Sequence, residues 1–223
     1  KIIISDIPGA TYHDGGRMIF GPDNLLYIST GDARNPESAQ DINSLSGKIL
    51  RLNDQGGIPD DNPFGNEIFS YGHRNPQGLT FDDKGNLWST EHGRSGILSG
   101  LDEINLIKKG DNYGWPIIQG LEKKEGMITP LIQSGEDITW APGDALWINN
   151  SLFFPGLRGE SLYEAEINQG GSINEIKAHF YKDFGRLRTA VLGPDGAIYI
   201  STSNTDGRGN IREGDDKIIK LVK

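Results

Sequence analysis

The sequence repeats a short pattern in which a tight turn precedes a β-rich run. The turns fall at residues 21–24, 82–85 and 193–196, and the runs that follow read LLYIST, NLWST and AIYIST. A weaker copy places Asn149 and Asn150 before residues 151–154. Short apolar runs bounded by Gly, Pro, Asn and Asp are typical of strands joined by hairpins. Amphipathic helical periodicity is almost absent, so the sequence predicts an all-β fold.

The spacing of these repeats indicates how the strands are grouped. Successive copies lie roughly 45 to 65 residues apart, the range expected of propeller blades with long loops. A four-stranded blade cannot bury both of its faces alone, whereas blades stacked around an axis cover one another. About four such units fit the chain. The alternative is a β-sandwich in which the similar hairpins arose by chance.

Composition excludes several classes of function. The formal net charge of −9 argues against binding to nucleic acid or to an anionic membrane. The chain has no cysteine, which excludes disulfides, thiolate catalysis and Cys-ligated metals. No apolar run approaches the length of a membrane-spanning helix. The sequence also lacks a phosphate-binding loop, a nucleophile elbow and a His-Glu-x-x-His zinc motif. Phosphoryl transfer by a P-loop and α/β-hydrolase chemistry are therefore disfavoured.

Two segments combine side chains that are suited to chemistry with Gly or Pro. His13 precedes two glycines and a strand, where it could act as a general base, and Asp14 lies next to it. The second segment contains Arg74, Asn75 and Gln77, three side chains that can make directional hydrogen bonds. The alternatives are a structural histidine in a turn and a solvated loop at the rim.

Two further groups of residues have side chains suited to binding a cation and an anion, respectively. Residues 91–94 and 102–105 mix carboxylates with glycine carbonyls, the hard oxygen ligands that Ca²⁺ prefers, although an acidic solvated loop would look the same. Arg158, Arg186 and Arg188 lie near strand ends. In an acidic protein, arginines gathered on one face could hold a small polyanion, and a solvated charged face is the alternative.

The motifs, in their order along the chain, resemble those of the soluble aldose sugar (glucose) dehydrogenases that depend on pyrroloquinoline quinone (PQQ). The matching segments cover nearly the whole chain: residues 13–17, 21–23, 47–52, 61–64, 72–79, 91–93, 102–105, 112–116, 186–188 and 193–196. The resemblance implies a six-bladed propeller. Residues 1–223 would then be a single propeller domain with about four of the blades, lacking about two at the N-terminal side.

The resemblance also assigns roles to individual residues. His13 matches the base that takes the proton from the sugar C1 hydroxyl, and Arg74 matches the residue that stabilises charge on the reduced quinone. The implied cofactor contacts are Arg74, Asn75, Gln77, Arg158, Arg186 and Arg188. The backbone carbonyls of Gly93 and Arg94 match the catalytic Ca²⁺ site. Glu103 and the backbone oxygen of Tyr113 match a second calcium site.

The function implied is oxidation of an aldose at C1 to the lactone, by proton abstraction and hydride transfer to PQQ. Electrons would pass to an external acceptor, and the protein would be periplasmic or extracellular. Two alternatives stay open. One is a calcium-dependent hydrolase of the lactonase type, which would not need the arginines. The other is a non-catalytic propeller that binds a glycan or a protein.

Overall fold

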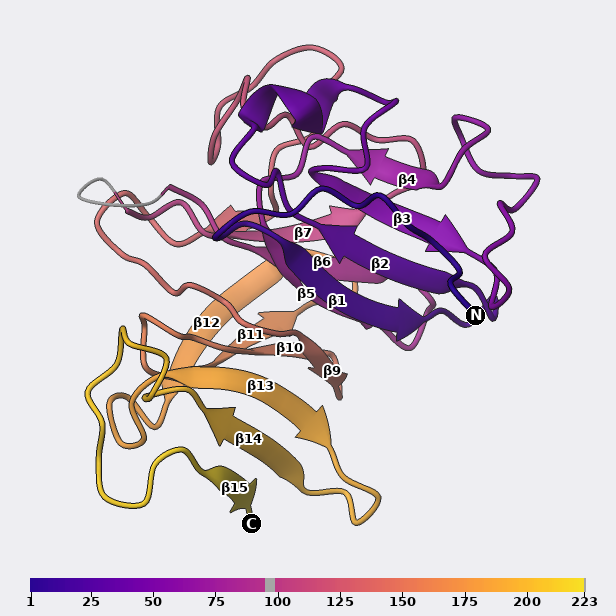
Figure 1. Cartoon of the computed structure of the whole chain (residues 1–223). Helices are drawn as coiled ribbons and strands as arrows, with labels where there is room; N and C mark the ends of the chain where they lie inside the picture. The colour runs from indigo at the N-terminus through magenta and orange to yellow at the C-terminus, as the bar shows by residue number, and fades with distance from the viewer. Residues whose placement is uncertain (95–98, 223) are drawn as a thin grey trace.

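The computed structural model describes residues 1–94 and 99–222, and its regular structure is almost entirely β-strand (Figure 1). The strands form four antiparallel sheets, and one 3-10 helix, η1 (Pro36–Gln40), lies between two strands of the first sheet. The prediction of an all-β fold is confirmed.

Each sheet is built from strands that are consecutive in the chain. The first sheet contains β1 (Gly15–Phe20), β2 (Leu26–Thr30), β3 (Lys48–Leu52) and β4 (Ile68–Tyr71). The second contains β5 (Pro76–Phe81), β6 (Leu87–Glu91), β7 (Glu103–Ile107) and β8 (Ile132–Gln133). The third contains β9 (Leu146–Ile148), β10 (Ser151–Pro155), β11 (Leu162–Ile167) and β12 (Ile173–His179). The fourth contains β13 (Leu187–Leu192), β14 (Ile198–Thr202) and β15 (Ile218–Leu221).

The repeated turns share one hydrogen-bond pattern, in which an aspartate is the acceptor. In the first, Asp23 accepts the backbone N–H of Leu25 and, through its other carboxylate oxygen, the hydroxyl of Tyr27. In the last, Asp195 accepts from Ala197 and Tyr199 in the same way. In the second sheet, Asp82 accepts from Lys84 and Asn86 and from the indole of Trp88. An aspartate thus ties each turn to an aromatic side chain on the following strand, which fixes the hairpin.

The third sheet begins with a tighter hairpin. Ile148 pairs with Ser151, and the two residues between them, Asn149 and Asn150, both have positive φ (51° and 63°). Asparagine tolerates this left-handed conformation, which two-residue hairpins require. The weakest copy of the repeat is therefore a genuine hairpin of a different length.

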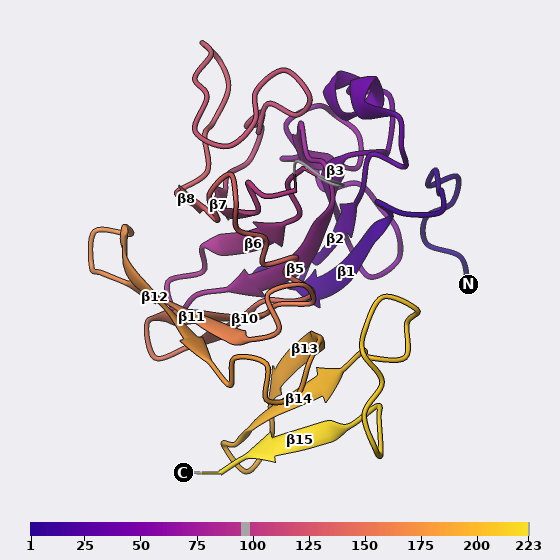
Figure 2. The same ribbon diagram turned by 90° about the vertical axis from the view of Figure 1, so that its left-hand side faces the viewer.

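The four sheets stack face to face in chain order (Figure 2). The first strands of the sheets contact one another, β1 with β5, β5 with β9, and β9 with β13. Apolar side chains of neighbouring sheets fill the space between them: Ile49, Leu79 and Leu87 between the first and second, Trp88, Ile104, Leu152 and Phe154 between the second and third, and Leu162, Leu187 and Ile200 between the third and fourth. This is the arrangement of propeller blades, about four of which are present.

The two ends of the array differ from its interior. On β1, Met18 and Phe20 are 64% and 58% exposed, and on the last sheet Val191 and Ile218 are 49% and 82% exposed. Stacking therefore leaves an apolar surface at each end of the array. Among the described residues, no helix has the length and apolar character needed to cross a bilayer.

Candidate functional site

A cleft of about 710 Å³ opens where the four sheets meet, and each sheet contributes part of its lining. It brings together residues that the sequence placed far apart. The lining includes seven of the predicted site residues: His13, Asn75, Gln77, Arg94, Arg158, Arg186 and Arg188. The other four, Arg74, Gly93, Glu103 and Tyr113, line a small pocket of about 20 Å³ that shares His92 and Arg94 with the cleft.

His13 is held by an aspartate that the sequence did not identify. Its Nδ1 lies 2.9 Å from Oδ1 of Asp32, which is buried and follows β2. Asp14, the neighbour in sequence, instead accepts the backbone N–H of Ala10. The residue that holds the ring of His13 is therefore Asp32 and not its neighbour in sequence.

Asp32 has further donors that keep it charged and in place. Its Oδ2 accepts the indole N–H of Trp115 at 2.9 Å, and its Oδ1 accepts the backbone N–H of Arg34 at 2.9 Å. Burial raises its pKa, but hydrogen bonds from His13, Arg34 and Trp115 outweigh burial and lower the pKa below the ordinary value. A charged carboxylate can only accept, so Nδ1 of His13 carries the proton. Nε2 is then the basic nitrogen of the ring.

The backbone brings the histidine close to strand β2. His13 has a positive φ of 68°, which is rare for a residue with a side chain. A Cβ on Gly31 would overlap the carbonyl oxygen of His13, so only glycine permits this approach. The close contact is what places the ring within reach of Asp32, the residue after Gly31.

Arg74 is buried beside the histidine and its partners. Its guanidinium lies 5.1 Å from the ring centre of Trp115, and Nη1 donates to the carbonyl of His92 at 3.2 Å. Burial lowers its pKa, while the carboxylates of Asp32 and Glu91 act in the opposite direction. Arginine stays protonated under these conditions, so a full positive charge lines the small pocket.

Glu91 fixes the turn that carries Arg74 and Asn75. Its Oε1 accepts the backbone N–H groups of both residues, and its Oε2 lies 3.1 Å from Nδ1 of the buried His73. His73 Nε2 in turn contacts Ser70 at 2.9 Å. The loop at residues 73–75 is therefore anchored by a chain of buried polar contacts.

The small pocket has a volume close to what one water molecule needs. Glu103 accepts from Gly120 at 3.3 Å and from Asn105 at 3.2 Å. Burial and the negative charge of Glu91 raise the pKa of Glu103 to about 8. Among residues 1–94 and 99–222, no cluster of three or more His, Asp or Glu side chains could hold a metal ion.

Asp102 organises the backbone around this pocket. It is 1% exposed; its Oδ1 accepts the N–H of Gly93 at 2.9 Å, and its Oδ2 accepts the N–H groups of Trp140 (2.6 Å) and Ala141 (2.8 Å). A Cβ on Gly93 would overlap the carbonyl oxygen of Leu101. The position of Gly93 thus depends both on having no side chain and on a buried carboxylate.

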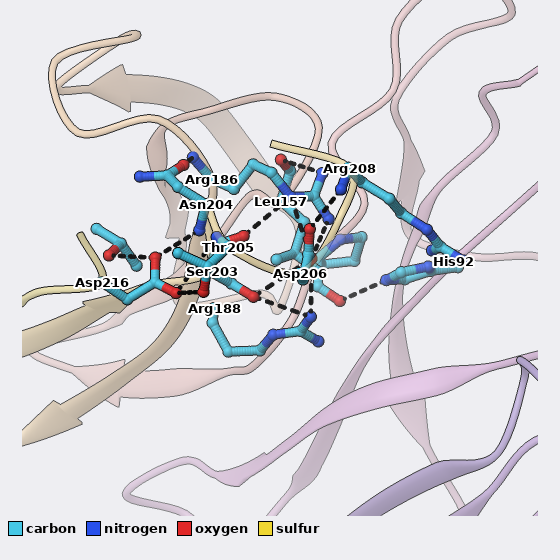
Figure 3. Close-up of polar contacts among 12 residues, drawn as sticks. His92, Leu157, Arg186, Arg188, Ser203, Asn204, Thr205, Asp206, Arg208 and Asp216 are labelled. Carbon is cyan, nitrogen blue, oxygen red and sulfur yellow. Dashed lines mark hydrogen bonds and ion pairs between the residues drawn. The ribbon is translucent and has the colours of Figure 1, made fainter. Parts of the chain in front are cut away.

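The arginines at the opposite wall differ in how firmly they are held (Figure 3). Arg186 donates to the carbonyl of Leu157 at 2.9 Å and, through Nε and Nη2, to Asp206 at 3.2 and 2.8 Å. Arg188 is looser: its Nη2 lies 3.4 Å from Ser203 and 3.5 Å from Asp206. Burial and the neighbouring positive charges of Arg186 and Arg208 lower the pKa of Arg188 against the pull of Asp206. Arg158 donates to Ser99 at 2.7 Å.

Comparison with known proteins accounts for this combination of fold and cleft. The model of the glucose/sorbosone dehydrogenase family matches residues 1–213. The chain belongs to the glucose/sorbosone dehydrogenase family. Aldose sugar dehydrogenase YliI of Escherichia coli K12 is 35% identical over 224 residues, which is 87% of this chain and 58% of that relative. The chain therefore spans somewhat more than half the length of that relative.

Two solved structures of similar proteins extend the comparison. One is the PQQ-bound aldose sugar dehydrogenase of Streptomyces coelicolor, with a TM-score of 0.89 and 40% identity over 96% of this chain and 63% of that one. The other is a protein of Thermus thermophilus provisionally described as an oxidoreductase (glucose dehydrogenase). It has a TM-score of 0.91 and 42% identity over 99% of this chain and 69% of that one. The fold is thus that of the PQQ-linked members of the glucose/sorbosone dehydrogenase family.

Sequence reasoning missed several residues of this family member's cleft. Asp32 and Asp206 hold His13 and Arg186, and Arg208 lines the cleft beside them. Asp32 lies in the loop after β2, and Asp206 and Arg208 lie in the loop between β14 and β15, but a sequence does not reveal which loops meet. Asp102 and Trp115 lie within two of the motifs that resemble the family, but the sequence indicated no role for either residue.

Proposed function

We propose that the chain carries most of the active site of a PQQ-dependent dehydrogenase that oxidises an aldose at C1 to the lactone. The observation that carries this proposal is the shared cleft, in which a histidine held by an aspartate lies across from several guanidinium groups. The PQQ-bound relative from Streptomyces coelicolor supports the cofactor, and the aldose sugar dehydrogenases support the substrate class.

The chemistry of the lining fits the cofactor. PQQ carries three carboxylates, and Arg158, Arg186 and Arg188 offer forks that match a carboxylate. In a chain with a net charge of −9, such a group of cations is unusual and favours an anionic ligand. Asn75 and Gln77 add amide groups to the same lining. The hydrolase alternative gives these arginines no role.

His13 would perform the proton transfer. Its Nδ1–H donates to Asp32, so the lone pair on Nε2 accepts the proton of the C1 hydroxyl, and Asp32 stabilises the imidazolium that forms. When bound, PQQ supplies the quinone that accepts the hydride from C1, so that the sugar loses one proton and one hydride. A non-catalytic propeller gives the His13–Asp32 pair no purpose.

Arg74 would stabilise the negative charge that develops on the acceptor. The guanidinium is buried, and burial makes a fixed charge more effective than it is in water. Its position is set by Trp115 and by the turn that Glu91 anchors. The charge therefore needs no rearrangement when the reaction occurs.

The oxygen donors fit calcium. Gly93 and Arg94 would supply backbone carbonyls to a catalytic Ca²⁺, and Glu103 with the Tyr113 carbonyl would hold a second ion. A Lewis acid at the first position would polarise the acceptor carbonyl. Burial and the charge of Glu91 raise the pKa of Glu103, and a positive ion at the second position would offset both effects.

Reconstitution tests the function directly. The purified chain, incubated with PQQ and Ca²⁺, should reduce an artificial dye only when an aldose is added, and the product should be the lactone. Chelation of calcium before PQQ is added should prevent the reaction. Stoichiometric PQQ binding without oxidation of any aldose would contradict the proposal.

Replacing Glu103 with glutamine tests the calcium site. In the wild type, Ca²⁺ at about 100 times its Kd should add about 2.7 kcal/mol to the free energy of unfolding, or roughly 5–10 °C in Tm. The E103Q variant should lose this increase. Without calcium, the raised folded-state pKa means that the wild type loses stability as the pH rises from 4.5 to about 8, and E103Q should not.

A matched control is Glu125→Gln, which removes an exposed carboxylate from the long segment that joins β7, the strand of Glu103, to β8. Thermal melts with and without calcium at several pH values provide the measurement. An equal calcium response in E103Q and in the wild type would exclude Glu103 as a ligand.

Three further parts of the proposal rest on the family resemblance. Electrons would pass to an external acceptor, and the protein would act in the periplasm or outside the cell. The four sheets would be part of a single, larger propeller, since Phe20 and Ile218 leave the apolar faces at both ends of the array uncovered. About two more blades would close such a ring.

A further inference from the structure

Arg208 belongs to none of the motifs considered above, yet it lines the cleft with Arg158, Arg186 and Arg188. It lies in the loop between β14 and β15, at the end of the Asp206-Gly207-Arg208 turn. Figure 3 shows its side chain extending from that loop toward His92. Arg208 therefore brings one more guanidinium to the cavity from the last sheet, in addition to those of Arg94, Arg158, Arg186 and Arg188.

The loop that carries Arg208 is firmly built. Oδ1 of Asp206 accepts the backbone N–H of Arg208 at 2.9 Å, and its Oδ2 holds Arg186. The N–H of Ser203 donates to the carbonyl of Arg186 at 2.9 Å. A Cβ on Gly209 would lie 2.7 Å from Cδ of Arg186, so the chain after Arg208 packs directly on that side chain. The exposed guanidinium thus projects from a fixed backbone.

The charges at this wall of the cleft explain what Arg208 adds to Arg158, Arg186 and Arg188. Asp206 pairs with Arg186 at 2.8 Å and neutralises much of its charge before any ligand arrives. Leu157 and Ser203 also accept from the same guanidinium, which leaves it few free N–H groups. Of the three arginines that the sequence predicted at this wall, only Arg158 and Arg188 then keep a largely uncompensated charge.

A ligand with three carboxylates needs a third positive charge. Arg94 also lines the cleft, but it lines the small pocket as well, where Glu91 and Glu103 supply negative charge. Among the residues that the structure describes, no carboxylate forms an ion pair with Arg208, and Asp206 already pairs with Arg186. Together, Arg158, Arg188 and Arg208 match the charge of a tricarboxylate one for one.

We propose that Arg208 binds a carboxylate of the anionic cofactor and so completes the charge that the Arg186–Asp206 pair cannot supply. The inference rests on the proposed function, because it assumes a tricarboxylate in the cleft. The contact would be a charge-assisted hydrogen bond from an exposed guanidinium on a rigid loop. Nothing in this role requires Arg208 for folding, since its side chain is exposed.

The test is the affinity of the chain for PQQ, measured by quenching of tryptophan fluorescence and independent of turnover. Arg208→Gln should raise the Kd by about ten- to a hundredfold, as expected for the loss of one charge-assisted hydrogen bond. Arg208→Lys, which keeps the charge but not the fork, should have a smaller effect. The loss in R208Q should shrink at high salt, because part of it is electrostatic.

The matched control is Arg212→Gln, which removes the same charge from the same loop. Arg212 donates to the carbonyls of Lys182 and Asp183 and does not line the cleft. A Kd for R208Q equal to that of R212Q, with the wild type binding PQQ, would overturn this inference and leave the proposed function intact. Failure of the wild type to bind PQQ would overturn both.

Discussion

Replacing His13 with alanine should reduce aldose oxidation by about 10²- to 10⁴-fold, the range typical of a lost general base. The affinity for PQQ should change by only a few fold, because the arginines that hold the carboxylates are untouched. Steady-state kinetics of the reconstituted variant, together with a cofactor titration, would separate the two effects. Turnover at the wild-type rate would show that another group accepts the proton.

The partner of the histidine provides the matched variant. Asp32→Asn keeps the size of the side chain but removes the charge that stabilises a protonated His13, and its amide can present a donor to Nδ1. We expect a loss of turnover without a loss of PQQ binding, as for H13A. Asp14→Asn alters the neighbour in sequence, whose carboxylate contacts Ala10 instead, and should retain most of the activity.

The second large effect is expected at Asp102. Asp102→Ala would leave the backbone N–H groups of Gly93, Trp140 and Ala141 without their shared acceptor in a buried region. Leaving buried donors unpaired should lower the free energy of unfolding by about 3–5 kcal/mol. For a chain of this size, that corresponds to a decrease in Tm of roughly 8–15 °C, measurable by thermal denaturation.

Asp137→Ala is the control for this change, because Asp137 is exposed in the segment that also carries Trp140 and Ala141. Its effect should stay within about 0.5 kcal/mol. If D102A melted within a degree or two of D137A, the three hydrogen bonds would not be what holds Gly93 in place. Loss of calcium binding in D102A should accompany the loss of stability.

The architecture could be predicted because its signal is local. Asp23, Asp82 and Asp195 each bond to a turn and to an aromatic residue within six positions, so the pattern repeats visibly in the sequence. Stacking of the sheets then follows from the apolar strands. The prediction of about four blades is confirmed.

The contacts within the site could be predicted only in part. His13 and its partner Asp32 are 19 positions apart and meet because Gly31 admits the backbone of His13, a contact that no spacing reveals. Likewise, Arg186 and Asp206 are joined only by the folding of the last sheet. The sequence could indicate which side chains have the right chemistry, but their pairing depends on loops that come together in three dimensions. The roles of the predicted site residues stay predictions.

The cleft lining is drawn from every one of the four sheets. A ligand bound there would contact all four sheets at once, whereas each sheet otherwise packs only against its neighbours. Binding of the ligand should therefore slow amide hydrogen exchange in all four sheets and slow proteolysis of the chain. Binding of the cofactor would therefore reduce local opening at the outermost strand, β15, as well as near His13.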